Sequence, residues 1–257
     1  MSFVPRCTQA ATSIAVAFLS LLWADTAHAL IVTTGCADIN RSCTLLELTA
    51  GGRIAVGDKL FSNWFADDAS TLQVNLSGIV VLPLDDQPQN PGLRFSASGN
   101  LRTLGLNQID LDFGFSVAAL TGARGVSGGS LALDQFAFGA NNAGGVIEIN
   151  EAILAANQAL LAEMIVLADN RPPSSPTLLP LEVAAFAPQQ RIVVENNILI
   201  TGDARTDTSS LLVFTQRFAQ QQQVSEPSGM AVATLGLAAL GFVRRRRKTS
   251  DRIQHLA

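Results

Sequence analysis

Histidine is nearly absent from this sequence, and its absence excludes most hydrolytic mechanisms. The chain has 257 residues and two histidines, His28 and His255, which lie close to its two ends. A Ser-His-Asp triad and a Cys-His pair both need an imidazole as the base. A zinc site would need ligands beyond the two cysteines of the middle region. Dinucleotide-binding and P-loop fingerprints are also missing, so no cofactor is expected.

Charge is scarce as well, and basic charge is scarcest in the middle of the chain. Charged residues make up 15% of the sequence, and residues 30–225 contain 10 Lys or Arg against 18 Asp or Glu, a net charge of −8. An acidic domain repels phosphate backbones, so nucleic acid is not an expected partner. Lys59 is the only lysine in this region, and its place beside Asp58 in a predicted turn favours a surface ion pair over Ser-Lys catalysis.

Residues 1–29 have the pattern of a secretory signal peptide. Arg6 precedes an apolar run over residues 10–23, and Ala27 and Ala29 supply the small side chains that signal peptidase requires. The run is too short for a lasting transmembrane helix. We therefore predict export and cleavage between Ala29 and Leu30, with a buried N-terminal helix as the alternative.

Export would place the remaining cysteines in an oxidising compartment. Cys7 lies in the signal peptide, which leaves Cys36 and Cys43. Two cysteines in an exported domain most simply form one disulfide, although two free thiols are the alternative. The bond would close an eight-residue loop and stabilise the fold by roughly 2.5 kcal/mol in the chain-entropy model.

The C-terminal segment predicts a helix that anchors the chain in a membrane. Residues 230–243 contain no polar residue except Thr234, and five cations follow at once: Arg244, Arg245, Arg246, Arg247 and Lys248. Fourteen helical residues reach about 21 Å, short of the roughly 30 Å hydrocarbon core. The cations stay cytoplasmic, which places the preceding chain outside the inner membrane. An apolar core helix with a basic end is the alternative. We interpret 220–229 as a linker, 230–248 as the anchor helix and 249–257 as a cytoplasmic trailer.

Residues 30–219 are predicted to form one domain of short strands. Alternating apolar and polar residues predict strands at 72–79 and 108–117. Further strands are predicted at 53–57, 60–65, 131–138, 191–200 and 211–218, and Pro83 with residues 85–92 predicts a long turn or loop. Many short strands of this kind predict an all-β fold, a β-sandwich or jelly roll.

One segment is ambiguous between helix and strand. Residues 151–168 are rich in Ala, Leu, Glu and Gln, which favours a helix by propensity alone. The same residues could form two strands, 146–154 and 160–168, that meet at a turn around Asn157. Propensity is a weak guide inside a sheet, so we favour the hairpin.

Two carboxylates on one predicted strand are the candidate catalytic pair. Asp110 and Asp112 would point to the same face about 7 Å apart. That spacing permits glycoside hydrolysis, but an acidic solvent face of an amphipathic strand explains it more simply.

Other acidic and aromatic residues suggest binding rather than catalysis. The pairs Asp67-Asp68 and Asp85-Asp86 could supply ligands for calcium, although no Asp-x-Asp-x-Asp-Gly loop is present. Trp64 and Phe65 could stack on a sugar ring, although a tryptophan in so apolar a run more often belongs to the core.

The C-terminal arrangement resembles a known sorting signal. Ser225, Glu226 and Pro227, followed by residues 230–243 and 244–247, resemble the signal of PEP-CTERM proteins of Gram-negative bacteria: a Pro-Glu-Pro motif, an apolar stretch and an arginine cluster. Ser225 stands where that motif has its first proline. Residues 57–63, 91–95 and 214–218 also resemble a recurrent ectodomain of this group. The resemblance implies processing by an exosortase and a role in the cell envelope, extracellular matrix or biofilm. It implies no reaction.

We therefore expect a non-catalytic surface or matrix protein that is exported, held transiently in the inner membrane and processed by signal peptidase and an exosortase. A carbohydrate-binding module that recognises exopolysaccharide is the alternative, and a glycan-active enzyme is the third hypothesis. An exposed aromatic platform would favour the module. A cleft with opposed carboxylates would favour the enzyme, and a smooth sandwich with neither feature would favour the first hypothesis.

Overall fold

A computed structural model describes residues 31–38, 41–120, 125–139, 144–171 and 176–220. These residues fall within one compact unit that ends at Gln220, and their buried apolar side chains form one hydrophobic core. The predicted signal peptide and the predicted sorting segment lie outside the described residues, as do both predicted terminal helices. Among the residues that are described, no helix is long and apolar enough to cross a membrane.

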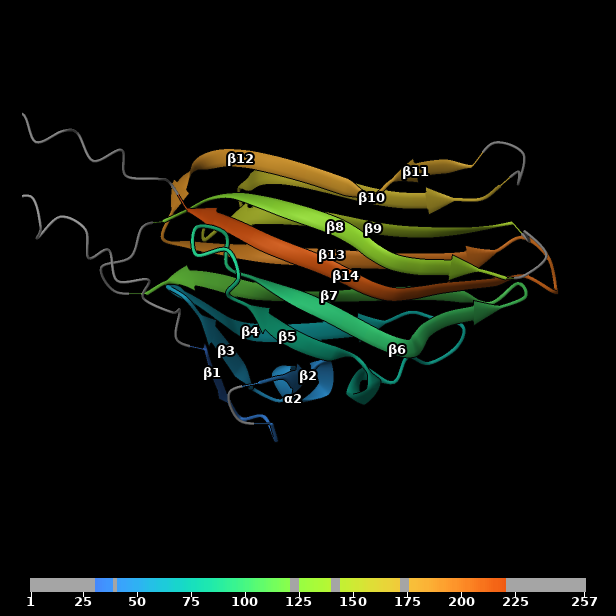
Figure 1. The fold of residues 1–257 in the computed structure, drawn as a ribbon, viewed down its shortest axis with the longest axis horizontal. Helices are drawn as coiled ribbons and strands as arrows, with labels where there is room; N and C mark the ends of the chain where they lie inside the picture. Colours follow the sequence, from blue (N-terminus) through green and yellow to red (C-terminus); the bar gives the residue numbers. More distant parts are fainter. Residues whose placement is uncertain (1–30, 39–40, 121–124, 140–143, 172–175, 221–257) are drawn as a thin grey trace, which may run out of the picture. The chain divides into compact units, whose positions relative to one another are not determined.

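Two antiparallel sheets pack face to face, with the smaller sheet in front in Figure 1. The larger sheet has eight strands, in the spatial order β1 (Ile31–Thr34), β3 (Arg53–Val56), β4 (Lys59–Asp68), β7 (Gln108–Ala119), β13 (Arg191–Gly202), β9 (Gly145–Ala155), β10 (Leu160–Asp169) and β11 (Thr177–Leu179). The smaller sheet has six, in the order β12 (Leu181–Gln189), β8 (Val126–Phe138), β14 (Thr208–Gln220), β6 (Gly92–Leu104), β5 (Val80–Leu84) and β2 (Cys43–Thr44). The helical elements α2 (Leu45–Thr49) and η1 (Leu76–Gly78) are short. The predicted β-sandwich is confirmed, whereas its refinement to a jelly roll stays a prediction.

Aromatic rings fill the space between the sheets. Phe95 and Phe214 are register partners on β6 and β14, and their rings stack with centroids 4.5 Å apart. Phe113 of the larger sheet brings its ring to 5.4 Å from Phe95. Trp64 is buried with its ring 4.4 Å from that of Phe115, which confirms its place in the core. Burying each such side chain contributes about 1.5–3 kcal/mol.

The ambiguous segment 151–168 forms the hairpin. β9 and β10 pair in register, with Glu151 opposite Met164, and the chain turns between them. Gln158 adopts a positive φ of 68° in this turn, and Asn157 accepts a hydrogen bond from the backbone N–H of Ala159. Helix propensity is overridden because every second residue of β9 is buried against the opposite sheet.

The predicted strand at 72–79 is wrong. The segment contains η1, and Asn75 caps it by accepting a hydrogen bond from the backbone N–H of Ser77 at 3.1 Å. An asparagine side chain that hydrogen-bonds to the backbone two residues later in the chain favours a turn over a strand. This local bond outweighs the alternating pattern of residues 72–79.

The sequence pattern predicted none of the strands β1, β2, β5, β6, β11 and β12, and β5 contains Pro83, which was placed in a turn. On one side β5 pairs with β6 along its length, but on the other side β2 reaches only Val80 and Val81. At Pro83, β5 therefore has a free edge. A proline is tolerated there because no neighbouring strand needs its missing N–H. The predicted loop at 85–92 is correct as far as Pro91, and β6 begins at Gly92.

The predicted ion pair between Lys59 and Asp58 is present, but Lys59 is buried and not on the surface. Its Nζ lies 2.6 Å from Asp58 Oδ1, but the Lys59 side chain is completely buried at the start of β4. Burial lowers the pKa of Lys59, while the hydrogen bond and the charge of Asp58 act in the opposite direction. Gln220 also donates to Asp58 Oδ1, at 2.8 Å.

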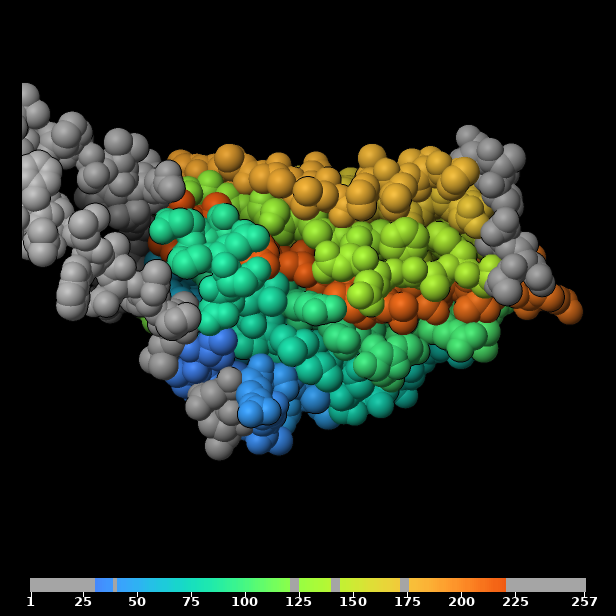
Figure 2. Space-filling view, viewed as in Figure 1, coloured from blue at the N-terminus to red at the C-terminus, as the bar shows by residue number. Residues whose placement is uncertain are grey.

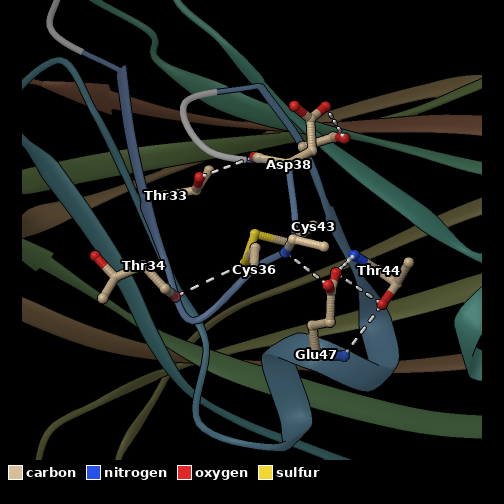
Figure 3. Close-up of a disulfide and its surroundings, with 9 residues drawn as sticks. Thr33, Thr34, Cys36, Asp38, Cys43, Thr44 and Glu47 are labelled. Atoms are coloured by element: carbon tan, nitrogen blue, oxygen red, sulfur yellow. Dashed lines mark hydrogen bonds between the residues drawn. A yellow bond between two sulfur atoms is a disulfide. The ribbon is translucent and has the colours of Figure 1, made fainter.

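The predicted disulfide between Cys36 and Cys43 is confirmed, with a Cα–Cα distance of 5.2 Å (Figure 3). The loop it closes is held by Glu47 of α2, whose carboxylate accepts hydrogen bonds from the backbone N–H groups of Ala37 at 2.8 Å and Thr44 at 2.7 Å. Thr44 returns the bond by accepting from the backbone N–H of Glu47, which completes a capping box. The bond from Thr44 and then that from Ala37 lower the pKa of Glu47.

Replacing both Cys36 and Cys43 by serine should lower the free energy of unfolding by roughly 2.5 kcal/mol, because the unfolded chain regains the entropy of an eight-residue loop. Urea denaturation of residues 30–220, which include the hydrophobic core of the described residues, measures the loss. Wild-type protein kept in a reducing agent should behave like the double variant. A midpoint unchanged by both treatments would contradict the stabilising role.

Candidate functional site

A depression of about 760 Å³ lies on the outer face of the eight-stranded sheet. Five neighbouring strands, β4, β7, β13, β9 and β10, supply its lining. Its exposed side chains alternate along each strand with side chains buried in the core, as expected of a sheet with one solvated face. The depression is therefore built from residues far apart in the sequence.

One row across the depression consists of carboxylates and amides. Asp67 of β4 is the register partner of Asp112 on β7, Asp112 is opposite Asn197 on β13, and Asn197 is opposite Asn150 on β9. The Nδ2 group of Asn197 donates to Asp112 Oδ1 at 2.9 Å and to Asp110 Oδ1 at 2.8 Å. Asp110 and Asp112 therefore share a face, as predicted, and one amide holds both.

The neighbouring row carries an exposed aromatic ring. Phe65 of β4 is opposite Gly114 of β7, and its side chain is 44% exposed. A Cβ atom at position 114 would lie 2.4 Å from Phe65 Cε1, so the ring lies directly against the backbone of Gly114. Any other residue at 114 would displace the ring. The row continues with Glu195 and ends with Glu163 on β10.

A β-bulge decides which aromatic side chain faces outward. The pairing of β4 with β7 shifts by one residue between Ser62 and Phe65, and Asn63 adopts a positive φ of 56° within the shift. The extra residue reverses the alternation, so that Trp64 enters the core and Phe65 faces the solvent. The only sequence signal for it is Asn63, because asparagine tolerates this conformation better than most residues.

The lining is acidic. Four exposed carboxylates face the depression, those of Asp67, Asp112, Glu163 and Glu195, and no Lys or Arg is among the lining residues that the structure describes. Low-dielectric walls focus this negative potential, which repels anions and attracts neutral or basic ligands.

The candidate calcium ligands do not come together. The Asp68 carboxylate is occupied by the backbone N–H groups of Ser70 and Val74, at 3.1 and 2.7 Å. Burial alone would raise the pKa of Asp68, but its hydrogen bonds with these two residues lower it. Both carboxylate oxygens of Asp86 accept hydrogen bonds from Nη2 of Arg217, each at 2.9 Å. Within the described ranges, no group of three or more His, Cys, Asp or Glu residues is placed to hold a metal ion.

A second polar cluster lies beneath the depression, inside the sandwich. Glu151, Asn196 and Gln216 are buried, and the Nε2 group of Gln216 donates both to Glu151 Oε2, at 2.5 Å, and to Asn196 Oδ1. Burial raises the pKa of Glu151 to about 8, and the bond from Gln216 opposes the rise. The remaining polar atoms of all three side chains have no partner in the described structure. The cluster joins the two sheets, and Glu151 and Asn196, each only 2% exposed, also belong to the lining of the depression.

Sequence reasoning had selected part of this site. Phe65, Asp67, Asp110 and Asp112 were candidates, and the structure brings them to one face. The sequence analysis did not identify a second group of residues at the site, because only strand pairing places them beside the first group. These residues are Gly114, Asn150, Glu163, Glu195 and Asn197. The predicted cleavage sites, Ala29-Leu30 and Ser225-Glu226-Pro227, and the cluster 244–248 lie outside the described residues.

No protein-family model matches the chain. No curated protein matches it either. Among solved structures, the carbohydrate-binding module TmCBM61 in complex with β-1,4-galactotriose is 11% identical, with a TM-score of 0.27 over 60% of this chain and 88% of that one. The arabinose-bound α-L-arabinofuranosidase MgGH51 is 12% identical, with a TM-score of 0.24 over 74% of this chain and 26% of that one. The enzymatically active domain of tailspike protein 4 from bacteriophage CBA120 is 13% identical, with a TM-score of 0.23 over 60% of this chain and 19% of that one.

Proposed function

We propose that this protein is an exported surface protein, sorted through its C-terminal segment by an exosortase, whose sandwich binds polysaccharide without cleaving it. The observation that carries the binding function is the Phe65 ring, exposed on Gly114 in the acidic depression. An aromatic face beside rows of carboxylates and amides combines the two contacts that a sugar needs: an apolar surface for its C–H groups and acceptors for its hydroxyls.

The charge of the depression supports one class of polysaccharide. Carboxylates accept hydrogen bonds from hydroxyl and ammonium groups but repel other carboxylates. The ligand is therefore an uncharged or basic polysaccharide, such as a neutral β-glycan or an amino-sugar polymer, and not one rich in uronic acids.

The arrangement of the acidic groups supports binding over catalysis. A glycosidase needs a carboxylic acid that keeps its proton at working pH and reaches the substrate. Burial raises the pKa of Glu151 to about 8, but its side chain is only 2% exposed and bonded to Gln216. Asp110 and Asp112 are both held by Asn197, an arrangement that suits fixed hydrogen-bond acceptors.

A glycan array of residues 30–220, with matched assays for released reducing ends, tests this function. Phe65→Ala should weaken binding roughly ten- to a hundredfold, since burying a phenylalanine side chain contributes about 1.5–3 kcal/mol. Leu106→Ala is the matched control, because Leu106 is 66% exposed but does not line the depression.

Three results would contradict parts of the proposal. Binding that is unchanged by Phe65→Ala would show that the depression is not the binding site. A preference for uronate-rich polymers would remove the assigned ligand class. Cleavage that disappears in Asp112→Asn would assign the third hypothesis, a glycan-active enzyme, in place of the binding module.

A further inference from the structure

The depression is long across the strands and short along them. On each of its five strands, which are neighbours in the larger sheet (Figure 1), the lining residues fall within three consecutive positions. Three positions on a strand span roughly 7 Å, whereas the four intervals between five strands span roughly 19 Å. We name the depression the cross-strand groove for this shape. From β4 to β10 its lining lies at 65–67, 112–113, 195–197, 150–152 and 163–165.

The cross-strand groove reaches both edges of the larger sheet. β3 pairs with β4 at 59–61 and β11 pairs with β10 at 167–169, so neither strand extends along the lining positions. Among the described residues, β4 and β10 are therefore the outermost strands of the sheet at the level of the groove. A site that runs from edge to edge suits the middle of a long chain, because the chain can continue past both outer strands.

Every strand of the groove presents an acceptor oxygen. The Nδ2 groups of Asn197 and Asn150 donate to neighbouring carboxylates, at 2.9 Å to Asp112 and at 2.6 Å to Glu148, which leaves each Oδ1 atom to accept from a ligand. The acceptors recur at the strand interval of about 4.8 Å. Donors that recur at a similar interval belong to a polymer of sugar rings, each of which carries hydroxyl or amino groups. The acceptor side chains are, from β4 to β10, Asp67, Asp112, Asn197, Asn150 and Glu163.

The exposed apolar side chains of the lining lie at the two ends of the groove. Phe65 on β4 is 44% exposed and Ile165 on β10 is 46% exposed, and four strand intervals separate the two strands. Between Glu195 and Glu163 in register lies Ala152, the smallest side chain of the lining, which leaves room on β9. One sugar ring cannot contact both apolar ends, whereas an extended chain can.

We propose that the cross-strand groove binds an internal segment of a linear polysaccharide, which lies across β4, β7, β13, β9 and β10 and continues beyond both edges of the sheet. A pyranose unit is about as long as one strand interval, so the four intervals hold about four units. This mode of binding rests on the proposed function. It names the ligand as a linear polymer bound along its length, in place of a free sugar or a chain end.

A series of oligomers tests the length of the bound segment on the wild-type protein. The probes are chitosan and cellulose oligomers of two to eight units, titrated calorimetrically into residues 30–220. Affinity should rise at least tenfold from two to four units and then level off, because each added unit reaches the acceptors of one more strand until the groove is full. A bulky fluorescent label on the reducing end should leave the affinity for eight units unchanged.

Equal affinity for two and for six units, or loss of binding on labelling the chain end, would overturn this mode of binding while the proposed function stands. Absence of binding by both series and by every polymer of the glycan array would overturn the proposed function as well.

A substitution on the floor of the groove tests the direction of the chain. Ala152→Trp should lower the affinity for six units to about that for two, because it obstructs the groove at β9 and leaves the part at β4 and β7 open. Ala132→Trp is the matched control. Ala132 is also half-buried on a strand with neighbours on both sides, and it lies between the buried residues Leu131 and Leu133. It therefore faces outward from the smaller sheet, whose strands form the face that Figure 2 shows.

Ala132→Trp should leave the affinity for every length unchanged. An affinity for six units that Ala152→Trp does not alter, or that Ala132→Trp lowers equally, would overturn the proposed path of the chain. Equal unfolding temperatures of the wild type and both variants establish that folding is not the cause.

Discussion

The free energy of unfolding should fall as the pH rises from about 5 to about 8, by an amount that approaches 1.4 kcal/mol per pH unit. The cause is Glu151, whose pKa is about 8 in the folded protein and 4.5 in the reference state. Between these values the folded chain binds a proton that the unfolded chain releases, so stability decreases with pH. The contribution is fully present below pH 4.5 and lost above pH 8.

Replacing Glu151 by glutamine should remove this slope. Glutamine keeps an oxygen that can accept the hydrogen bond from Gln216 Nε2, but it has no charge to bury. The variant should match the wild type near pH 5 and exceed its stability at pH 8. Urea denaturation at half-unit pH steps measures both curves.

Glu163→Gln is the matched control, because Glu163 is exposed on the neighbouring strand β10. It should leave the slope unchanged. Carboxyl groups with lowered pKa values, those of Glu47, Asp68 and Asp169, lose their stabilising effect only at more acidic pH. A wild-type curve that is flat between pH 5 and 8 would show that Glu151 titrates normally and is not sealed in the core.

The second large effect concerns where the protein is found in the cell. Replacing Arg244–Lys248 by glutamines should release unprocessed precursor from the inner membrane, since the cations resist translocation and act as a stop. Under the proposed sorting, replacing Glu226 and Pro227 by alanines should instead leave the precursor anchored, because the exosortase would lose its recognition motif. Fractionation of the native host, followed by mass spectrometry of each fraction, distinguishes the two outcomes.

Mature protein in the same experiment should begin at Leu30, and Met1 on the surface form would exclude cleavage of the signal peptide. Leu106→Ala within the sandwich serves as the control and should not alter sorting. If both tail variants reached the surface with the wild-type mass, the segment would not be a sorting signal. The polysaccharide-binding proposal would be unaffected, because it depends on the depression alone.

Features that depend on near neighbours in the chain could be predicted from the sequence. The disulfide joins residues only seven positions apart, so composition and the predicted export were enough to predict it. Most strands were predicted because alternation reports which side chains are buried. The hairpin at 151–168 was correctly preferred over a helix because propensity is a weak guide inside a sheet. The strand predicted at 72–79 is wrong because the capping side chain of Asn75 competes with the sheet.

The site depended on interactions that no local pattern records. Sequence analysis by itself predicted the all-β fold and the shared face of Asp110 and Asp112, and it favoured a buried place for Trp64 without excluding an exposed one. Only the tertiary structure decided that Phe65 faces outward, because one extra residue at Asn63 reverses the alternation of β4. It alone placed Gly114 beneath the Phe65 ring and Glu151 beside Gln216, since these pairs meet through strand pairing and sheet packing between distant segments. Alternation along a strand says which side chains share a face, and only the registers between strands say which of them are neighbours.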